Sequence, residues 1–170
     1  MHYLERVTTE YIEMEDRLRL TGILRSGKTI SFWFTQRLLI QLLLACTDWL
    51  ENQSPDIAKK IATSQSKDSA LSLAQESAKS ELHAETSVVA SPNSPNLLVK
   101  ELDIKFRTEG IELVIKAKNE RFSLKLDTKQ LRQWLSIIYM LWQNAQWPNS
   151  HWPDWMTLND ASPSLASSVH

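Results

Sequence analysis

Residues 17–50 read RLRLTGILRSGKTISFWFTQRLLIQLLLACTDWL, and the architecture follows from their pattern. Apolar and polar residues alternate on both sides of Ser26 and Gly27, which predicts two strands joined by a hairpin turn. The alternation then changes to a long apolar run, which predicts a helix. Thr35 precedes this run and is a suitable N-cap residue, so we expect the helix to begin there.

The second half of the chain repeats this plan. Residues 111–142 read IELVIKAKNERFSLKLDTKQLRQWLSIIYMLW, which predicts two strands, a turn and a helix whose capping box begins at Asp127. A further alternating strand precedes this hairpin at residues 102–107, and a weaker counterpart precedes the first hairpin at residues 7–14. Apolar positions match between the halves, among them Leu18 with Ile111, Phe32 with Leu124, Leu43 with Leu135 and Leu50 with Trp142.

These patterns predict an α+β fold made of a duplicated βββα unit, or ββα at minimum. A single unit of about 45 residues would bury too little surface to be stable alone. We therefore expect the units at residues 1–51 and 98–147 to share one core and to pack about a pseudo-twofold axis. Each unit would contribute antiparallel sheet and one long helix.

The residues between and after the units differ in composition. Residues 52–97 are rich in Ser and Ala, contain three prolines and have no aromatic residue. A short helix around residues 70–82 fits the pattern, but it would bury too little apolar surface to offset the entropy of ordering. We therefore predict a flexible linker at 52–97. Residues 148–170 are predicted to be a Trp- and Pro-containing segment followed by a disordered tail.

Composition favours a cytoplasmic protein without membrane contact. The net charge of −1 gives no overall attraction to nucleic acid or to a membrane surface. The N-terminal residues are charged and lack the apolar core of a signal peptide. The longest apolar run, residues 38–50, is shorter than the roughly 20 residues that a membrane span needs. Cys46 is the single cysteine, which excludes an intrachain disulfide and suits a reducing compartment.

The sequence lacks the motifs of the common enzyme classes. Its three glycines are scattered and form neither a phosphate-binding loop nor a nucleophile elbow. The histidines are not spaced as metal ligands. We therefore expect no catalytic residues, no metal site and no cofactor. The four histidines are His2, His83, His151 and His170.

Basic residues on the outward face of the predicted strands form the first candidate site. A basic sheet face that carries an aromatic residue is typical of proteins that bind single-stranded nucleic acid. In topology alone, the βββα duplication is similar to the Pur and Whirly domains, and this resemblance implies the same activity. The alternative, which we favour, is a solvated strand face whose charges protect sheet edges. The candidates are Arg17, Arg19, Trp33, Lys105, Arg107, Lys116, Arg121 and Lys125, with Lys28 and Lys118 in the turns.

Tryptophans form the second candidate site. Residues 141–156 read LWQNAQWPNSHWPDWM, in which the prolines stop the helix and favour an extended chain. One interpretation is that the segment folds back and covers the core. The other is a docking segment, because tryptophan is enriched among interface anchors. The candidate partner-binding residues are Trp147, Trp152 and Trp155.

From these observations we predict a small, non-enzymatic protein-interaction or assembly protein. It would bind a protein partner or a second copy of itself as a homodimer. Binding of single-stranded nucleic acid through the basic sheet face is the alternative. A small molecule held between sheet and helices is a third hypothesis, since apolar pockets leave little trace in a sequence.

Overall fold

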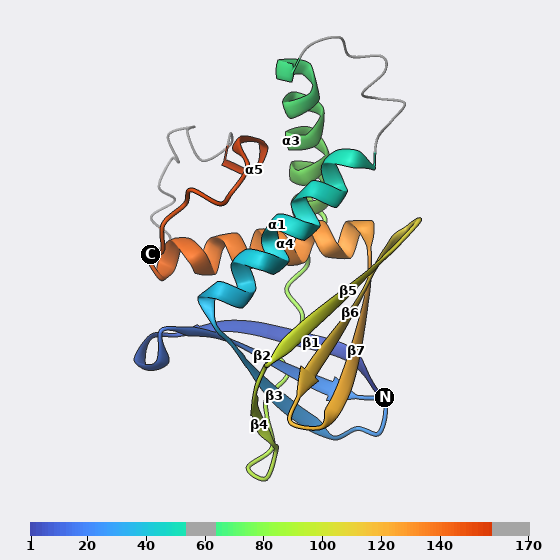
Figure 1. Cartoon of the computed structure of the whole chain (residues 1–170), viewed down its shortest axis with the longest axis vertical. Coiled ribbons are helices and arrows are strands. Elements are labelled where there is room, and N and C mark those ends of the chain that lie inside the picture. Colours follow the sequence, from blue (N-terminus) through green and yellow to red (C-terminus); the bar gives the residue numbers. More distant parts are fainter. Residues whose placement is uncertain (54–63, 158–170) are drawn as a thin grey trace.

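The computed structural model describes residues 1–53 and 64–157, and in these ranges the fold is mixed α+β (Figure 1). A single seven-stranded sheet curls on itself, and the helices gather at one of its ends. The α+β class expected from the sequence is thus confirmed.

Three strands and a helix follow one another in each half of the chain. None of the helices in the described ranges has the length and apolar character that a membrane span requires. The first half contains β1 (His2–Ile12), a short 3-10 helix (Glu13–Glu15), β2 (Arg17–Leu24), β3 (Thr29–Phe34) and α1 (Gln36–Asn52). The second half contains β5 (Glu101–Arg107), β6 (Gly110–Ala117), β7 (Glu120–Asp127) and α4 (Thr128–Asn144). The remaining elements are α3 (Ser64–Ser80), β4 (Asn96–Leu98) and α5 (Asp154–Thr157).

Both long helices begin at the expected capping residues. The hydroxyl of Thr35 accepts a hydrogen bond from the backbone N–H of Leu38 at 3.3 Å. The carboxylate of Asp127 accepts from the N–H of Gln130 at 2.7 Å, and the Gln130 side chain accepts from the N–H of Asp127 at 3.0 Å. These bonds satisfy N–H groups that the first turn of a helix leaves without a partner.

The strand order across the sheet is β4-β3-β2-β1-β7-β6-β5. Neighbours within each half are antiparallel, as expected. The halves, however, join through two parallel pairings, β1 with β7 and β3 with β4. The sheet is therefore mixed, which corrects the expectation of antiparallel pairing throughout. The long connections between the paired strands allow this, because they let the chain return to the sheet in the same direction.

A single run of chain, residues 96–107, forms both outer strands of this order. The N–H of Val99 donates to the carbonyl of Trp33 in β3 at 3.0 Å. The N–H of Lys100 donates to the carbonyl of Lys116 in β6, also at 3.0 Å. Because β4 and β5 are consecutive and pair with opposite ends of the strand order, the sheet must curl.

Apolar side chains from both halves fill the inside of the curled sheet. Phe32 of β3 and Phe122 of β7 meet edge to face, with ring centroids 4.9 Å apart. Leu43 of α1 and Leu135 of α4, a matched pair in the sequence, are buried in the same cluster. The hydrophobic pattern of the two halves therefore describes one shared core.

Residues 64–97 differ from the expected flexible linker. They include α3, which packs against α4 with Leu71 and Ala78 buried. The buried amide of Gln75 donates to the carbonyl of Arg132 and to the hydroxyl of Ser136, both at 2.7 Å. Composition misses this contact because it depends on one amide and a few small apolar residues. Residues 54–63 of the expected linker lie outside the described residues, as does the expected disordered tail at 158–170.

The chain after α3 continues along the sheet and also departs from the linker prediction. The N–H of Val88 donates to the hydroxyl of Thr8 in β1 at 2.8 Å, and Val88 is buried. The N–H of Ser31 in β3 donates to the carbonyl of Pro95 at 2.9 Å. These bonds hold residues 84–95 against the sheet up to the start of β4.

The packing of α3 on α4 predicts a large difference between two leucines on the same helix. Leu71 is 5% exposed, whereas Leu73 is 72% exposed. We expect Leu71→Ala to lower the free energy of unfolding by about 2–4 kcal/mol, because it leaves a cavity. Leu73→Ala, the matched control, should change it by less than about 0.5 kcal/mol. Urea denaturation measures both, and equal effects would contradict the packing of α3.

Candidate functional site

The tryptophans selected from the sequence lie inside the protein. Trp147, Trp152 and Trp155 are all buried. The rings of Trp147 and Trp152 both meet Trp142 of α4 edge to face, at 5.0 and 5.6 Å. The chain turns back after α4 at Gln146, whose φ is 56°. The segment therefore folds back onto the core, as the first of the two interpretations predicts. Its indoles are buried and are not exposed anchors for a partner.

Polar contacts hold the same segment in place. The indole N–H of Trp147 donates to the carboxylate of Asp16 at 2.8 Å. The indole N–H of Trp155 donates to the carboxylate of Glu51 at 2.9 Å. Binding a partner through these rings would require breaking both bonds and exposing the rings.

Carboxylates neutralise much of the basic strand face in the second half. The ammonium group of Lys116 lies 3.0 Å from Glu101 and 2.8 Å from Asp103. Its hydrogen bonds to these carboxylates, that to Asp103 first, raise the pKa of Lys116. Lys105 and Arg107 lie 3.7 and 2.8 Å from Glu112. Lys125 is exposed on β7 opposite Glu112, and Arg121 is exposed opposite Lys116.

Glu112 shows that this face is built from matched charges. Its side chain is nearly buried and accepts hydrogen bonds from Arg107 at 2.8 Å and from Ser123 at 2.9 Å. These bonds, that from Arg107 first, lower the pKa of the Glu112 carboxyl group, so it stays ionised. A phosphate would have to compete with this carboxylate for the same two cations.

Arg19 of the first half is also engaged within the chain. Arg19 pairs with Glu10 at 3.0 Å, and its guanidinium lies 5.6 Å from the ring centre of Trp33. Arg17 is half-buried at the start of β2. These contacts favour a solvated strand face over a surface for single-stranded nucleic acid.

The paired charges predict weak binding to oligonucleotides. Fluorescence anisotropy with a labelled single-stranded 20-mer should give a dissociation constant no tighter than about 10⁻⁴ M at moderate salt, the weak end of non-specific binding. Trp33→Ala should leave this value unchanged. Micromolar binding that disappears in Trp33→Ala would instead support the nucleic-acid alternative, because base stacking contributes about 1–3 kcal/mol.

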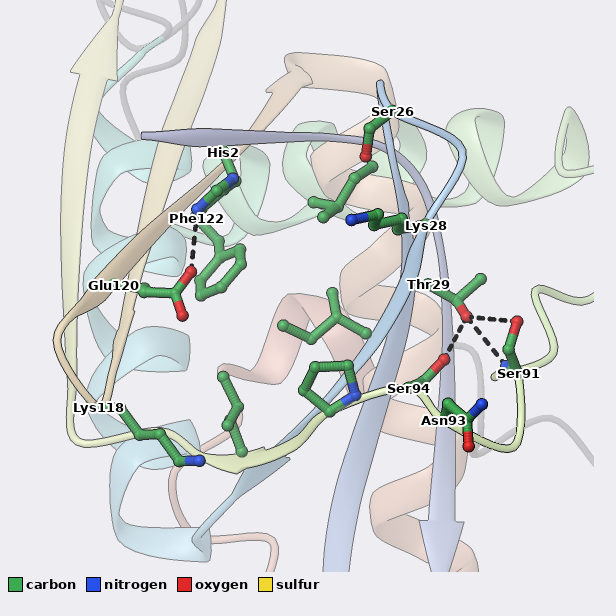
Figure 2. A pocket seen from close by; sticks show the side chains of 14 residues that line it. His2, Ser26, Lys28, Thr29, Ser91, Asn93, Ser94, Lys118, Glu120 and Phe122 are labelled. Atoms are coloured by element: carbon green, nitrogen blue, oxygen red, sulfur yellow. Dashed lines mark hydrogen bonds and ion pairs between the residues drawn. The ribbon is translucent and has the colours of Figure 1, made fainter.

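A cavity of about 780 Å³ lies at the end of the curled sheet away from the helices, and we call it the open-end cavity (Figures 1 and 2). Its floor is apolar and includes Leu24, Ile30, Leu97 and Phe122. Its rim comes from the β2–β3 turn, the β6–β7 turn, the N-terminus and the turn before β4. The polar lining residues are His2, Ser26, Lys28, Thr29, Ser91, Asn93, Ser94, Lys118 and Glu120.

Hydrogen bonds organise one side of this rim. The hydroxyl of Thr29 accepts from the N–H of Ser91 at 2.9 Å and donates to the Ser91 hydroxyl at 3.2 Å. The same Thr29 hydroxyl contacts the hydroxyl of Ser94. The turn before β4 is therefore attached to β3, and the rim on this side is pre-formed (Figure 2).

A contact between His2 and Glu120 organises the other side of the rim. His2 Nε2 lies 2.9 Å from a carboxylate oxygen of Glu120. The imidazole of His2 also stacks on Phe122, with ring centroids 5.1 Å apart. Glu120, the one carboxylate that the described residues contribute to the lining, is thus turned toward His2 (Figure 2).

Two lysines reach into the cavity from different turns. Lys28 follows Gly27, whose φ of 79° permits the tight β2–β3 turn. Lys118 lies in the β6–β7 turn and itself has a φ of 51°, a conformation that few non-glycine residues adopt. Figure 2 shows the two lysines on opposite sides of the cavity that they line. Within residues 1–53 and 64–157, neither lysine forms an ion pair.

Sequence reasoning did not select this cavity as a site. Its only trace in the sequence is that both predicted hairpin turns carry a lysine. In the described parts of the chain, no group of three or more His, Cys, Asp and Glu side chains is arranged to hold a metal ion. Comparisons of the chain with protein-family models, with curated proteins and with solved structures gave no match. The geometry of the open-end cavity therefore provides the basis for a functional proposal.

Proposed function

We propose that this protein is a non-enzymatic binding protein whose open-end cavity takes a small, largely apolar molecule. The observation that supports this proposal is the cavity's form: about 780 Å³, with an apolar floor and a polar, partly pre-formed rim. Sites for small molecules are typically concave, roughly 300–1,000 Å³ in volume, and apolar apart from a few polar groups. The open-end cavity has these properties.

Burial of apolar groups would supply the binding energy. Each methylene group transferred from water to an apolar surface contributes about 0.8 kcal/mol. Six such groups would contribute about 5 kcal/mol, part of which offsets the loss of translational freedom. Affinities for apolar molecules of this size should therefore be no tighter than about 0.2 mM.

A neutral fluorescent dye, N-phenyl-1-naphthylamine, tests this proposal. We expect its fluorescence to rise on binding to the wild-type protein. Ser26→Trp should weaken binding about tenfold, because an indole on the exposed Ser26 would occupy the space next to the floor. Ser80→Trp, on the exposed end of α3, is the matched control and should bind the dye like the wild type. Absence of dye binding, or equal binding by Ser26→Trp, would contradict the proposal.

Protein interaction, the function favoured by the sequence, is the second candidate and is supported by a different surface. A groove of about 340 Å³ lies between α3 and α4 and is lined at its base by Trp155 and Met156. Met140, on its wall, is 54% exposed. Leu82, on the same lining, is 42% exposed, so a twofold contact would bury Leu82 and Met140 of each copy against the other. We propose a second copy of the chain as the occupant.

This second candidate predicts self-association that depends on the groove. Size-exclusion chromatography with light scattering should show a dimer at about 100 µM, a concentration at which weak interfaces associate. Met140→Lys should give a monomer, because it places a charge in the apolar contact. Leu44→Lys is the control, since Leu44 is 47% exposed on α1, away from the groove lining. A monomeric wild type, or a dimer unaffected by Met140→Lys, would contradict this candidate.

We also propose that the two halves arose by duplication and are related by a pseudo-twofold axis. Each half runs from three strands into a helix. The third strand of one half pairs in parallel with the first strand segment of the other at both junctions, β7 with β1 and β3 with β4. Exchange of the halves would convert one junction into the other, as such an axis requires.

The cytoplasm is the compartment that we propose. Cys46 is buried, and burial raises the pKa of its thiol to about 12, so it stays protonated and unreactive. A chain with a single cysteine of this kind needs no oxidising environment for its stability.

A further inference from the structure

We propose that the ligand of the open-end cavity carries an anionic group, a carboxylate or a phosphate, and that Lys28 and Lys118 bind it. This inference rests on the proposed function and adds the chemical class of the ligand. The ligand would be a small amphiphile, with an apolar part on the floor and its anion at the rim.

The charges of the lining support an anionic ligand. The cavity is lined by Lys28, Lys118 and His2 and by one carboxylate, Glu120. A carboxylate oxygen of Glu120 lies 2.9 Å from His2 Nε2, so Glu120 is already engaged with His2. Two ammonium groups are left in the lining without a carboxylate partner among the described residues.

The position of the two lysines points to a shared ligand. Lys28 and Lys118 belong to different halves of the chain, yet both line the same cavity, from opposite sides of it (Figure 2). The cavity therefore presents positive charge on two sides, and either ammonium group would attract the anionic group of a bound ligand.

Neutral donors next to the lysines would complete the binding of an anion. Ser26 and Asn93 line the same cavity, and neither makes a hydrogen bond to another described residue. A hydroxyl and an amide can each donate to a carboxylate or phosphate oxygen. Thr29, by contrast, is engaged with Ser91 and Ser94 and serves to hold the rim.

The basic residues of the outer sheet face differ from the two lysines of the cavity. There, Lys105, Lys116 and Arg107 each lie within 4 Å of a carboxylate of the same chain. Arg121 and Lys125 on that face form no ion pair with a described residue, but none of these five cations lines the open-end cavity with its apolar residues. The open-end cavity combines unpaired ammonium groups with an apolar floor.

Displacement of N-phenyl-1-naphthylamine from the full-length protein tests the inference. The competitors are decanol, decanoate and decyl phosphate, which share one alkyl chain and differ in the head group. We expect both anions to displace the dye at about tenfold lower concentration than decanol, because two exposed charge pairs each contribute modestly. The preference should weaken as salt rises. The ratio between decanoate and decyl phosphate shows which anion the site prefers.

The double variant Lys28→Gln with Lys118→Gln should lose this preference. It should still bind the dye and decanol as the wild type does, because the apolar floor is unchanged. The matched control is Lys105→Gln with Lys125→Gln, which removes two charges from the outer sheet face and should keep the preference for anions.

The possible results separate the inference from the function on which it rests. If decanol and the dye bind but the anions bind no more tightly, the anionic ligand is contradicted and the apolar binding function stands. If the preference for anions persists in the Lys28→Gln, Lys118→Gln variant, the assignment of these lysines is contradicted. If neither the dye nor any competitor binds, both proposals fail.

Discussion

The backbone hydrogen bonds of Val99 and Lys100 are the constraint on which the rest of this structure depends. One bond reaches β3 and the other reaches β6, so a single run of chain belongs to both ends of the strand order. This arrangement brings the two halves around one interior, where Phe32 and Phe122 meet. Without this segment, β3 would be an unpaired edge strand of the sheet.

The curl of the sheet gives the molecule two different ends. At one end, α1 and α4 lie over the core, and the tryptophan segment and α3 pack around them (Figure 1). At the other end only turns and the N-terminus surround the interior, and there the open-end cavity forms. The ligand site that we propose is thus a consequence of covering one end of the sheet with helices and leaving the other to short turns.

The outer sheet face and the open-end cavity also differ in how their charges are paired. The overall net charge is −1, which predicts no particular ligand. On the outer sheet face, cations and carboxylates alternate between neighbouring strands and form pairs, with Glu112 at the centre of one group. Among the described residues of the open-end cavity, the one carboxylate contacts His2, and the two lysines form no ion pair. The local arrangement, and not the total, therefore indicates the chemistry of the ligand.

The sequence by itself determined the local elements of this protein. Alternation placed the strands, and the capping residues Thr35 and Asp127 marked where the long helices begin, because these features depend on neighbours within a few residues. The matched leucines, among them Leu43 and Leu135, lie in one buried cluster.

Only the tertiary structure decided how distant segments meet. The docking of α3 through Gln75, the parallel pairings and the burial of Trp152 all join residues far apart in the chain. The same holds for the candidate site, since Lys28 and Lys118 become neighbours of one cavity only when the sheet curls. Periodicity and composition report which face of an element is apolar, but they do not report which other element covers that face.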